Sequence, residues 1–395
     1  MYSPIKITET THYIGVNDRR KPLFENQIPL PYGVSYNSYI VEDERTALID
    51  TVDVCYFDVF LRKIDTVLGN RPLDYLIINH MEPDHSGSIR LIRERYPDIQ
   101  IVGNAKTFDM IKGYFGITDN LLEVKDGDTL SLGRQTLQFL LTPMVHWPET
   151  MMTYNPSDGT LFSGDAFGSF GTPDGGILDS SINTDRFWSE MRRYYANIVG
   201  KYGIPVQSAL NKLRPLKINT ICSTHGAVWV EQKEKVIDLY DKLSRYQPLE
   251  QGAVIAYGSM YGHTEEMAEA IAEGISAGGV RNIVLYDVSK TDASFILSDI
   301  FKYSALVIGS PTYMNEIMPA VETLLHKIEI RGIKNRIFAA FGSCTWAGVA
   351  PKRILPVAEN LKWNIIGAVE EKQALKAEKY AEFFELGQNI AKQIS

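Results

Sequence analysis

Short apolar runs separated by polar turns dominate the chain from its beginning to about residue 165. Bounded runs of this kind are typical of buried strands, whereas longer runs with apolar residues three or four positions apart are typical of helices. The pattern predicts helices over 58–68 and 88–96. It predicts strands at 47–50, 74–79, 138–141 and 160–162.

An Asp-Gly-Asp sequence at 126–128 separates the apolar runs 121–124 and 130–132. An Asp-Gly turn between two strand-type runs is a strong signal for a β-hairpin. We therefore expect these two runs to pair with each other.

The pattern changes at 247–252, a polar segment with a proline and a glycine that suits a linker. Beyond it, strand-type runs alternate with helical stretches, the first of which begins near Thr264. This alternation predicts right-handed crossovers and a doubly wound parallel sheet, closer to the flavodoxin-like layout than to a full dinucleotide-binding fold. The strands are predicted at 253–257, 282–286, 305–309 and 336–341. We expect an α/β protein with two domains, 1–249 and 250–395.

The composition limits the classes of function. With 395 residues, the chain is long enough for two or three domains of about 150 residues each. Its 45% hydrophobic and 22% charged residues are ordinary for a soluble globular protein, and no apolar run is long enough to span a bilayer. A net charge of -8 argues against nucleic acid or an anionic membrane as a partner.

The three cysteines are widely spaced and odd in number, so they predict no disulfide framework, zinc site or iron–sulfur cluster. The beginning of the chain has no apolar segment of the signal-peptide type. Both observations favour a cytoplasmic protein.

The densest group of residues with metal-binding side chains follows a predicted strand. His80 and Glu82 point to the same side of an extended chain, and Pro83 disfavours helical geometry at Glu82. Asp84 and His85 then enter a turn that leads into a helix, so the four side chains can converge within about ten ångströms. This segment therefore predicts a metal site.

Three more candidates stand at the ends of later strands, namely His146, Asp165 and His225. Four imidazoles and three carboxylates are enough for two metals that share one bridging carboxylate. A single buried His or Asp beside a glycine is more often a hydrogen-bonded structural residue. Seven such groups, four of them within six positions, favour a metal site instead.

The order H-x-E-x-D-H at 80–85 resembles the H-x-H-x-D-H motif of the metallo-β-lactamase superfamily, with Glu82 in place of the second histidine. The carboxylate adds negative charge and a hard oxygen, and no thiolate is present, so the preference moves from zinc toward iron or manganese. Together with the later His, Asp and His, this order resembles the flavodiiron proteins over essentially the whole chain. The resemblance implies an N-terminal metallo-β-lactamase-like αββα domain followed by a flavodoxin-like domain.

The resemblance also implies the metal ligands. In some family members the histidine at the position of His85 is not coordinated. Tyr195 resembles a tyrosine that lies near the diiron pocket in the family. The alternative interpretation is that Tyr195 is a helix residue packed in the core. Each iron would keep an open position for a diatomic ligand. One iron would be held by His80, Glu82 and His146, the other by Asp84, His85 and His225, with Asp165 bridging the two.

Three loops that follow predicted strands in the second half carry the residues expected to bind FMN. In the first, Ser259, Thr264 and the N–H groups of a tight turn at a helix start form an anion cradle, and the lack of a lysine distinguishes it from a P-loop. The other two each offer an aromatic ring, Tyr313 and Trp346, to flank the isoalloxazine at the strand ends where such sheets bind ligands. This arrangement resembles flavodoxin with its three FMN loops. The candidate contacts are Ser259, Met260, Tyr261, Gly262, His263, Thr264, Pro311, Thr312, Tyr313, Met314, Asn315, Ser343, Cys344, Thr345, Trp346, Ala347 and Gly348.

Together the two sites match a reductase of small diatomic gases. FMN exchanges one or two electrons and a diferrous pair supplies two more, which suits reduction of O2 to water or coupling of NO to N2O. The resemblance implies a head-to-tail homodimer, or a dimer of dimers, with the flavin of one subunit against the diiron site of the other. Because the chain has no CxxC pair, electrons must come from outside, from rubredoxin, a flavin reductase or a reduced deazaflavin. The choice between O2 and NO stays open, since no named ligand differs between the two uses.

Two other classes of protein remain as alternative interpretations of the sequence. One is a dinuclear zinc hydrolase of the metallo-β-lactamase type with a fused flavodoxin module, and Glu82 is the feature against it. The other is a flavin electron carrier whose metal domain is only structural.

Overall fold

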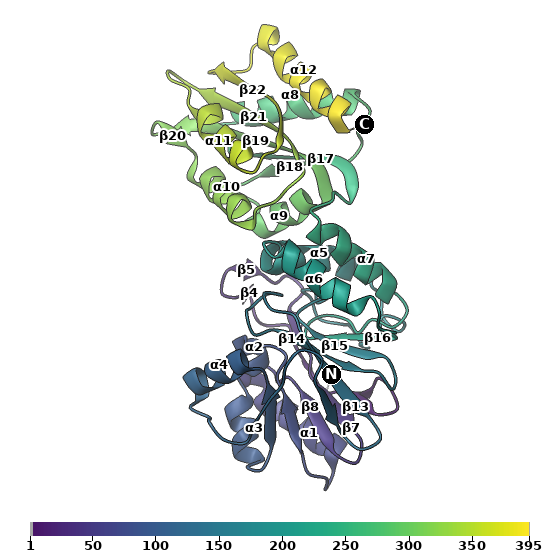
Figure 1. The fold of residues 1–395 in the computed structure, drawn as a ribbon. Helices are drawn as coiled ribbons and strands as arrows, with labels where there is room; N and C mark the ends of the chain where they lie inside the picture. Colours follow the sequence, from purple (N-terminus) through teal and green to yellow (C-terminus); the bar gives the residue numbers. More distant parts are fainter. Residues whose placement is uncertain (1–2, 395) are drawn as a thin grey trace. The chain divides into compact units, whose positions relative to one another are not determined.

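The computed structural model describes residues 3–394, which form two compact units (Figure 1). One unit comprises the described residues up to Tyr194 together with Ile204–Asp241. The other comprises Tyr195–Gly203 and the described residues from Lys242 onward. The second unit thus begins a few residues before position 250 and also takes in a short segment around residue 200.

The first unit is built on two sheets. The strand order is β1-β2-β7-β8-β9-β10-β11 in one sheet and β12-β13-β14-β15-β16 in the other, and β3 with β6 and β4 with β5 form two short pairs. The first sheet contains β1 (Ile5–Lys6), β2 (Thr11–Tyr13), β7 (Tyr39–Glu42), β8 (Thr46–Ile49), β9 (Tyr75–Ile77), β10 (Gln100–Gly103) and β11 (Leu121–Glu123). The second contains β12 (Thr129–Ser131), β13 (Thr136–Leu141), β14 (Met151–Asn155), β15 (Thr160–Gly164) and β16 (Thr220–Ser223). The short pairs are β3 (Val16–Asp18), β6 (Val34–Tyr36), β4 (Leu23–Phe24) and β5 (Ile28–Pro29).

The main core of the first unit lies between its two sheets, where Ile49 of β8 and Phe162 of β15 belong to one buried cluster. Helices α1, α3 and α4 lie beside the first sheet, and α5, α6 and α7 beside the second (Figure 1). Phe60, Ile64 and Leu68 of α1 are buried at a spacing of four, so a single apolar stripe packs the helix onto the sheet. The αββα architecture expected from the sequence is confirmed. The helices are α1 (Phe57–Leu68), α2 (Pro83–Ser86), α3 (Ile89–Arg95), α4 (Ala105–Phe115), α5 (Asp185–Tyr194), α6 (Gly203–Leu213) and α7 (Lys233–Ser244).

The prediction of a β-hairpin around residues 126–128 is wrong. β11 pairs in parallel with β10 in the first sheet, whereas β12 pairs antiparallel with β13 in the second. The turn itself is present, because the N–H of Asp128 donates to the carbonyl of Lys125 at 3.1 Å, but it carries the chain from one sheet to the other. Turn chemistry is local, whereas the strand that lies alongside is chosen by contacts between distant segments.

The second unit has a parallel sheet with the strand order β18-β17-β19-β21-β22, and the short β20 pairs antiparallel with β19. Numbered within this unit the order is 2-1-3-4-5, which is the flavodoxin-like layout. Helices α8 and α12 pack on one face, where Ile271 and Phe383 join the buried cluster, and α9, α10 and α11 lie on the other (Figure 1). The elements are β17 (Glu250–Tyr257), α8 (His263–Ala277), β18 (Ile283–Asp287), α9 (Ala293–Lys302), β19 (Tyr303–Tyr313), β20 (Glu316–Ile317), α10 (Pro319–Arg331), β21 (Ile337–Cys344), α11 (Ala350–Asn360), β22 (Asn364–Lys372) and α12 (Ala377–Ile394).

The other strands and helices predicted from the apolar pattern are confirmed, with ends that differ by one or two residues in most cases. The expected linker is shorter than predicted, because β17 already begins at Glu250. None of the helices within residues 3–394 is long and apolar enough to cross a membrane.

Candidate metal centre and flavin-binding loops

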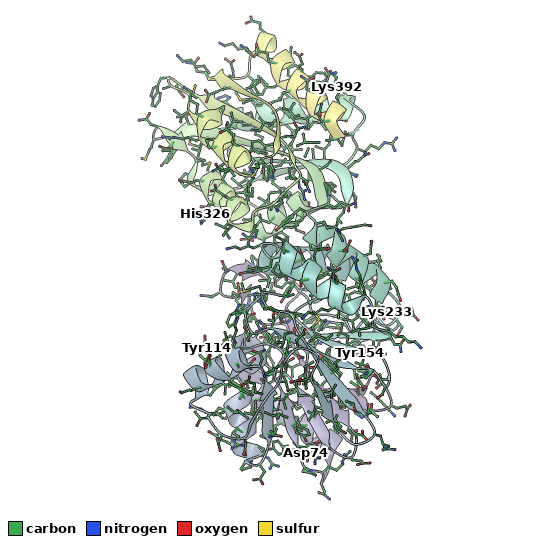
Figure 2. All side chains as sticks on the ribbon, viewed as in Figure 1. Asp74, Tyr114, Tyr154, Lys233, His326 and Lys392 are labelled. Atoms are coloured by element: carbon green, nitrogen blue, oxygen red, sulfur yellow. The ribbon has the colours of Figure 1, made fainter. Side chains whose placement is uncertain are left out.

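The seven candidate metal ligands lie after strands of both sheets in the first unit, and their side chains are all buried. His80, Glu82, Asp84 and His85 follow β9, the last two within α2. The other three are His146 after β13, Asp165 after β15 and His225 after β16. Of the seven histidines in the chain, three lie outside this cluster, namely His12, His263 and His326, the last exposed on α10 (Figure 2).

The segment after β9 has the conformation that its sequence predicts. Glu82 is extended, with φ -59° and ψ 138°, and Pro83 occupies the first turn of α2. His80 and Glu82 point the same way as a result, with His80 Nε2 3.4 Å from Glu82 Oε2. The helical turn brings the next two ligands together, with His85 Nε2 3.4 Å from Asp84 Oδ2.

Asp165 lies between two groups of ligands. Its Oδ2 is 3.0 Å from His146 Nε2 and 3.6 Å from His80 Nε2. Its Oδ1 is 3.1 Å from His85 Nε2 and 3.9 Å from His225 Nε2. One oxygen therefore faces each group, which is the geometry of a bridging carboxylate. The first group is His80, Glu82 and His146, and the second group is Asp84, His85 and His225.

Within each group the ligand atoms have the spacing of atoms that share one ion. Glu82 Oε2 is 3.2 Å from His146 Nε2, and Asp84 Oδ2 is 3.4 Å from His225 Nε2. Two atoms bound at right angles to one ion, each at about 2.1 Å, lie roughly 3 Å apart. The distances in both groups fit this arrangement.

The hydrogen bonds leave lone pairs directed at the centre of the cluster. His225 Nδ1 is 2.6 Å from the carbonyl oxygen of Ser35, and because a carbonyl only accepts, the imidazole donates from Nδ1 and presents a lone pair at Nε2. His80 Nε2 and both carboxylate oxygens of Asp84 have no hydrogen-bond partner among the described residues. Buried polar atoms without partners are costly, so these residues fit a pair of metal ions. Four imidazoles and three carboxylates without a thiolate favour iron or manganese.

Burial and charge shift the pKa values of the ligands in both directions. Burial would raise the pKa of Asp165, but the charges of His85 and His80 hold it well below its usual range. Burial raises the pKa of Asp84 to about 7. Burial and the charge of His85 lower the pKa of His225 to about 4. Metal ions bind deprotonated ligands, so loading this cluster releases any protons that its ligands hold.

Three residues that support the ligands were not among the candidates. Glu149 Oε1 is 2.7 Å from His80 Nδ1 and also accepts from the N–H of Met81 at 2.9 Å. The hydroxyl of Thr224 donates to Asp165 Oδ1 at 2.5 Å, and Ser35 binds His225 as described above. Such partners fix the orientation of metal-binding side chains. Glu149 and Thr224 stand within three positions of a ligand in the sequence, but nothing near Ser35 marks it.

Tyr195, expected near the diiron pocket or packed in the core, is fully buried. Tyr195 packs against Phe301, with ring centroids 5.9 Å apart, and belongs to the second unit. The ring of the neighbouring Tyr194 lies beside the ligand cluster, with its centroid 5.4 Å from that of His225. Successive residues on a helix point about 100° apart, and a π-helical turn, Tyr195–Val199, follows α5 directly. The phase of the helix therefore decides which of the two tyrosines faces the cluster.

The three loops expected to bind FMN follow β17, β19 and β21, which are adjacent and parallel. The strand order reverses between β17 and β19, and ligands of such sheets bind at this point. In the first loop the N–H of Gly262 donates to Ser259 Oγ at 3.1 Å, and the φ of 94° at Gly262 favours glycine. α8 begins at the next residue, so its first N–H groups are available to an anion. Thr264 Oγ1 lies 2.8 Å from Ser343 Oγ, which joins the first loop to the third.

Large apolar side chains of these loops are exposed. The exposed fraction is 88% for Tyr261, 82% for Met314 and 81% for Trp346. Thr312 Oγ1 accepts from the N–H of Val349 at 3.1 Å, which holds the second loop against the third. Exposed aromatic groups gathered at one edge of a sheet mark a surface that a ligand or partner covers. The other candidate contacts lie in these loops or at the ends of the preceding strands, namely Met260, His263, Pro311, Tyr313, Asn315, Cys344, Thr345, Ala347 and Gly348.

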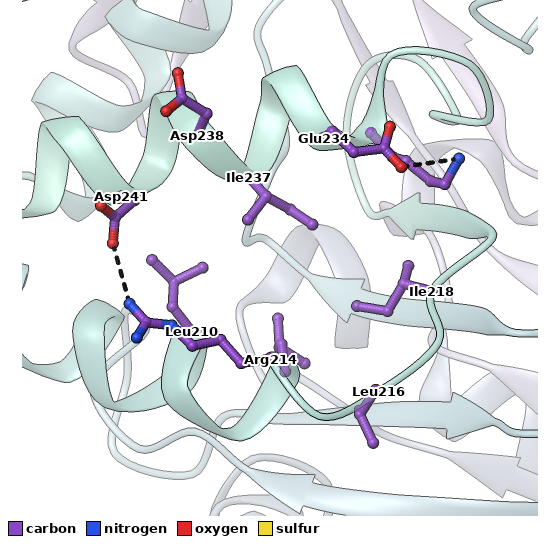
Figure 3. A pocket seen from close by; sticks show the side chains of 10 residues that line it. Leu210, Arg214, Leu216, Ile218, Glu234, Ile237, Asp238 and Asp241 are labelled. Carbon is purple, nitrogen blue, oxygen red and sulfur yellow. Dashed lines mark ion pairs between the residues drawn. The ribbon is translucent and has the colours of Figure 1, made fainter.

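A surface cavity of about 410 Å³ lies elsewhere in the first unit, between α6 and α7 (Figure 3). Its wall includes Ile237, and ion pairs join Arg214 with Asp241 and Lys233 with Glu234. No candidate metal ligand or FMN contact lines this cavity, so it is separate from both sites.

Comparisons with known proteins cover both units. A family model described as "ODP family beta lactamase" matches residues 34–226, and the flavodoxin model matches residues 255–386. A nitric oxide reductase of Moorella thermoacetica is 32% identical over 404 residues, which covers 100% of each chain. The solved structure of rubredoxin oxygen:oxidoreductase from Desulfovibrio gigas has a TM-score of 0.94 at 30% identity and covers 99% of this chain and 98% of its own. The flavodiiron protein from Giardia intestinalis has a TM-score of 0.94 at 26% identity, with 99% and 96% covered.

Proposed function

Because the chain belongs to the flavodiiron protein family, we propose that it reduces O2 to water, NO to N2O, or both. It is an oxidoreductase whose cofactors are a non-haem diiron site and FMN. The observation that carries this proposal is Asp165, whose two oxygens face two separate groups of ligands. Each group contains one further carboxylate, Glu82 or Asp84. Two of the similar proteins are named as a nitric oxide reductase and a rubredoxin oxygen:oxidoreductase, one for each gas.

The proposed ligand sets are the first group for one iron and the second group for the other, with Asp165 bridging. A bound pair of irons supplies electrons and open positions at which a diatomic ligand can bind. Glu149 and Ser35 hold the rings of His80 and His225 in place. The ring of Phe24 lies 5.5 Å from that of His225, so an apolar side chain packs beside the second group.

The proposed flavin site uses the three loops after β17, β19 and β21. The N–H groups at the start of α8 and the hydroxyl of Thr264 would hold the phosphate without a cationic side chain. Tyr313 and Trp346 would flank the ring system, and the contact between Thr264 and Ser343 keeps the first and third loops together. When bound in these loops, FMN would exchange electrons with the external donor.

We further propose rubredoxin or a flavin reductase as the electron donor, with a reduced deazaflavin as the alternative. Cys55, Cys222 and Cys344 are free thiols, so the chain supplies no metal–sulfur centre of its own for this step. We propose the cytoplasm as the location, since free thiols suit a reducing compartment. Residues 1–249 and 250–395 are the proposed diiron and FMN domains.

A head-to-tail homodimer, alone or within a dimer of dimers, is the proposed assembly. It would bring the flavin of one subunit to the diiron site of the other. Tyr261 and Met314 are 88% and 82% exposed in the loops that would bind FMN, and a partner subunit at this edge of the sheet would cover them.

The function is tested with purified protein whose iron, zinc, manganese and FMN contents are measured. We expect iron-loaded protein, reduced anaerobically, to consume O2 or NO and to form water or N2O when the gases are supplied in parallel. Asp165→Ala removes the bridging oxygen atoms and should abolish consumption of both gases. Asp119→Ala, which removes a carboxylate with a side chain 73% exposed, is the matched control and should leave consumption unchanged.

Two results would contradict the proposal. Protein that contains zinc and hydrolyses esters or lactams without gas uptake would be a hydrolase. An Asp165→Ala variant with full gas consumption would be a flavin electron carrier whose metal domain is only structural.

A further inference from the structure

Tyr36 is a buried tyrosine whose ring lies beside the metal-ligand cluster and whose hydroxyl has no part in the functions assigned above. Tyr36 is the last residue of β6, and its side chain is fully buried. Its ring centroid is 6.1 Å from that of His225. The preceding residue, Ser35, binds His225 Nδ1 through its carbonyl oxygen at 2.6 Å, so this strand is held directly against a ligand.

The hydrogen bond that Tyr36 accepts leaves its own proton without a partner. Lys21 Nζ donates to the Tyr36 hydroxyl oxygen at 2.9 Å. An ammonium group is a donor only, so Lys21 cannot accept the hydroxyl proton. Among residues 3–394 no acceptor forms a hydrogen bond with that proton. A buried donor without an acceptor is costly, so the hydroxyl is suited to a small group bound beside it.

The packing of its ring indicates which group of ligands Tyr36 lies beside, because the ring contacts that of His225. Burial raises the pKa of Tyr36, and the next largest cause is the negative charge of Asp84. Asp84 and His225 both belong to the second group. Both oxygens of Asp84 also lack a hydrogen-bond partner among the described residues. The ring packing against His225 therefore puts Tyr36 beside the second group.

We propose that Tyr36 donates a hydrogen bond to the small ligand bound at the second group, and that Lys21 is the positioning residue that orients the hydroxyl for this contact. This inference rests on the proposed diiron site and adds a catalytic residue to it. A hydrogen-bond donor fixed in a buried site stabilises negative charge that develops on a reduced substrate.

Lys21 is held in turn by a surface carboxylate. Asp53 Oδ2 lies 3.1 Å from Lys21 Nζ, and the two side chains are 19% and 30% exposed. The same ammonium group lies 5.4 Å from the centroid of the Tyr36 ring. Asp53 and the Tyr36 ring thus hold Lys21 beside the hydroxyl oxygen. Because Lys21 can only donate a hydrogen bond, the hydroxyl proton points away from it.

Azide tests this inference, because it is a small anion that binds to oxidised iron without being reduced. Its dissociation constant and its infrared stretching frequency are measured on iron-loaded wild type, Tyr36→Phe and Tyr13→Phe, in H2O and in D2O. Tyr13 is the matched control, since it is also fully buried with a hydroxyl that lacks a hydrogen-bond partner, but it lies in the core between the sheets. Iron content is measured for each variant.

The loss of one hydrogen bond to a charged group should weaken azide binding by about tenfold or more in Tyr36→Phe. The azide band should shift, and the difference between H2O and D2O should disappear. Tyr13→Phe should match the wild type. Unchanged affinity and an unchanged band in Tyr36→Phe would overturn the inference.

Lys21 provides a second test that leaves the tyrosine in place and decides the question if Tyr36→Phe does not retain iron. Lys21→Met should shift or broaden the azide band, and Lys21→Arg should restore it, because the guanidinium is again a donor only. A wild-type band in Lys21→Met would overturn the role of Lys21. If the wild type itself binds iron but no azide, the proposed ligand position fails as well. If it binds no iron, the proposed diiron function fails first.

Discussion

At the scale of single residues, Glu82 separates this metal centre from one built for zinc. Its carboxylate lies between two imidazoles, with Oε2 3.4 Å from His80 Nε2 and 3.2 Å from His146 Nε2. A histidine at this position would supply a third nitrogen and remove one negative charge from the first group. Nitrogen-rich sites with less charge favour zinc over iron.

Glu82→His should therefore change the metal that the protein retains. We expect protein produced with both metals available to gain zinc, lose iron and lose gas consumption. Elemental analysis and turnover measured on the same sample test this. Glu94→His, which changes an exposed glutamate of α3, is the matched control and should retain iron. An iron content and turnover equal to wild type in Glu82→His would contradict the role given to this carboxylate.

The sequence allowed most of the metal site to be predicted at this scale, because ligand chemistry is a property of the side chain itself. The seven candidate ligands lie together in the structure in the two expected groups. The position of Tyr194 beside His225 could not be predicted, because it depends on a helix phase that local sequence leaves open. The hydrogen bond from His225 to the Ser35 carbonyl could not be predicted either, because a residue of any type has a backbone carbonyl.

At the scale of elements, the start of α8 determines how the flavin phosphate would be held. The loop before it contains no lysine or arginine, so binding depends on N–H groups and hydroxyls. Thr264 is 1% exposed and lies in the first turn of the helix. Its contact with Ser343 makes it part of two loops at once.

Thr264→Val should weaken FMN binding by about tenfold, because one hydrogen bond to a charged phosphate is lost while the shape of the side chain is kept. Titration of the FMN-free protein with FMN, followed by quenching of flavin fluorescence, measures this. Thr323→Val is the matched control, since its hydroxyl donates to the Pro319 carbonyl on the exposed side of α10. Equal FMN affinities in the two variants would show that Thr264 does not contact the phosphate.

The hairpin expected around 126–128 shows where prediction of elements stops. Both strands and the turn exist, but β11 and β12 belong to different sheets. A turn signal reports a preference of two or three residues for certain backbone angles. It carries no information on which distant strand will pair with the strands on either side of the turn.

At the scale of the whole molecule, the proposed dimer links the two cofactors. If the flavin of one subunit serves the iron pair of the other, turnover per subunit should fall when the protein is diluted until it dissociates. Gas consumption at a series of protein concentrations, with the mass of the assembly measured in the same buffer, tests this prediction. Reduction of FMN by the donor should not fall, because it needs only one subunit. Constant gas consumption per subunit in a protein shown to be monomeric would rule out the head-to-tail arrangement.

The sequence by itself determined the chemistry of both sites and the class of both folds. Ligand types, the extended conformation at Glu82 before Pro83, and the alternation of strands and helices after Glu250 are local properties that a chain carries before it folds. Only the tertiary structure decided which atoms meet. It placed one oxygen of Asp165 toward each group of ligands, Tyr194 beside His225, and Lys21 against Tyr36. These contacts join residues far apart along the chain, and their geometry follows from packing of the two sheets and their helices, which no short stretch of sequence encodes.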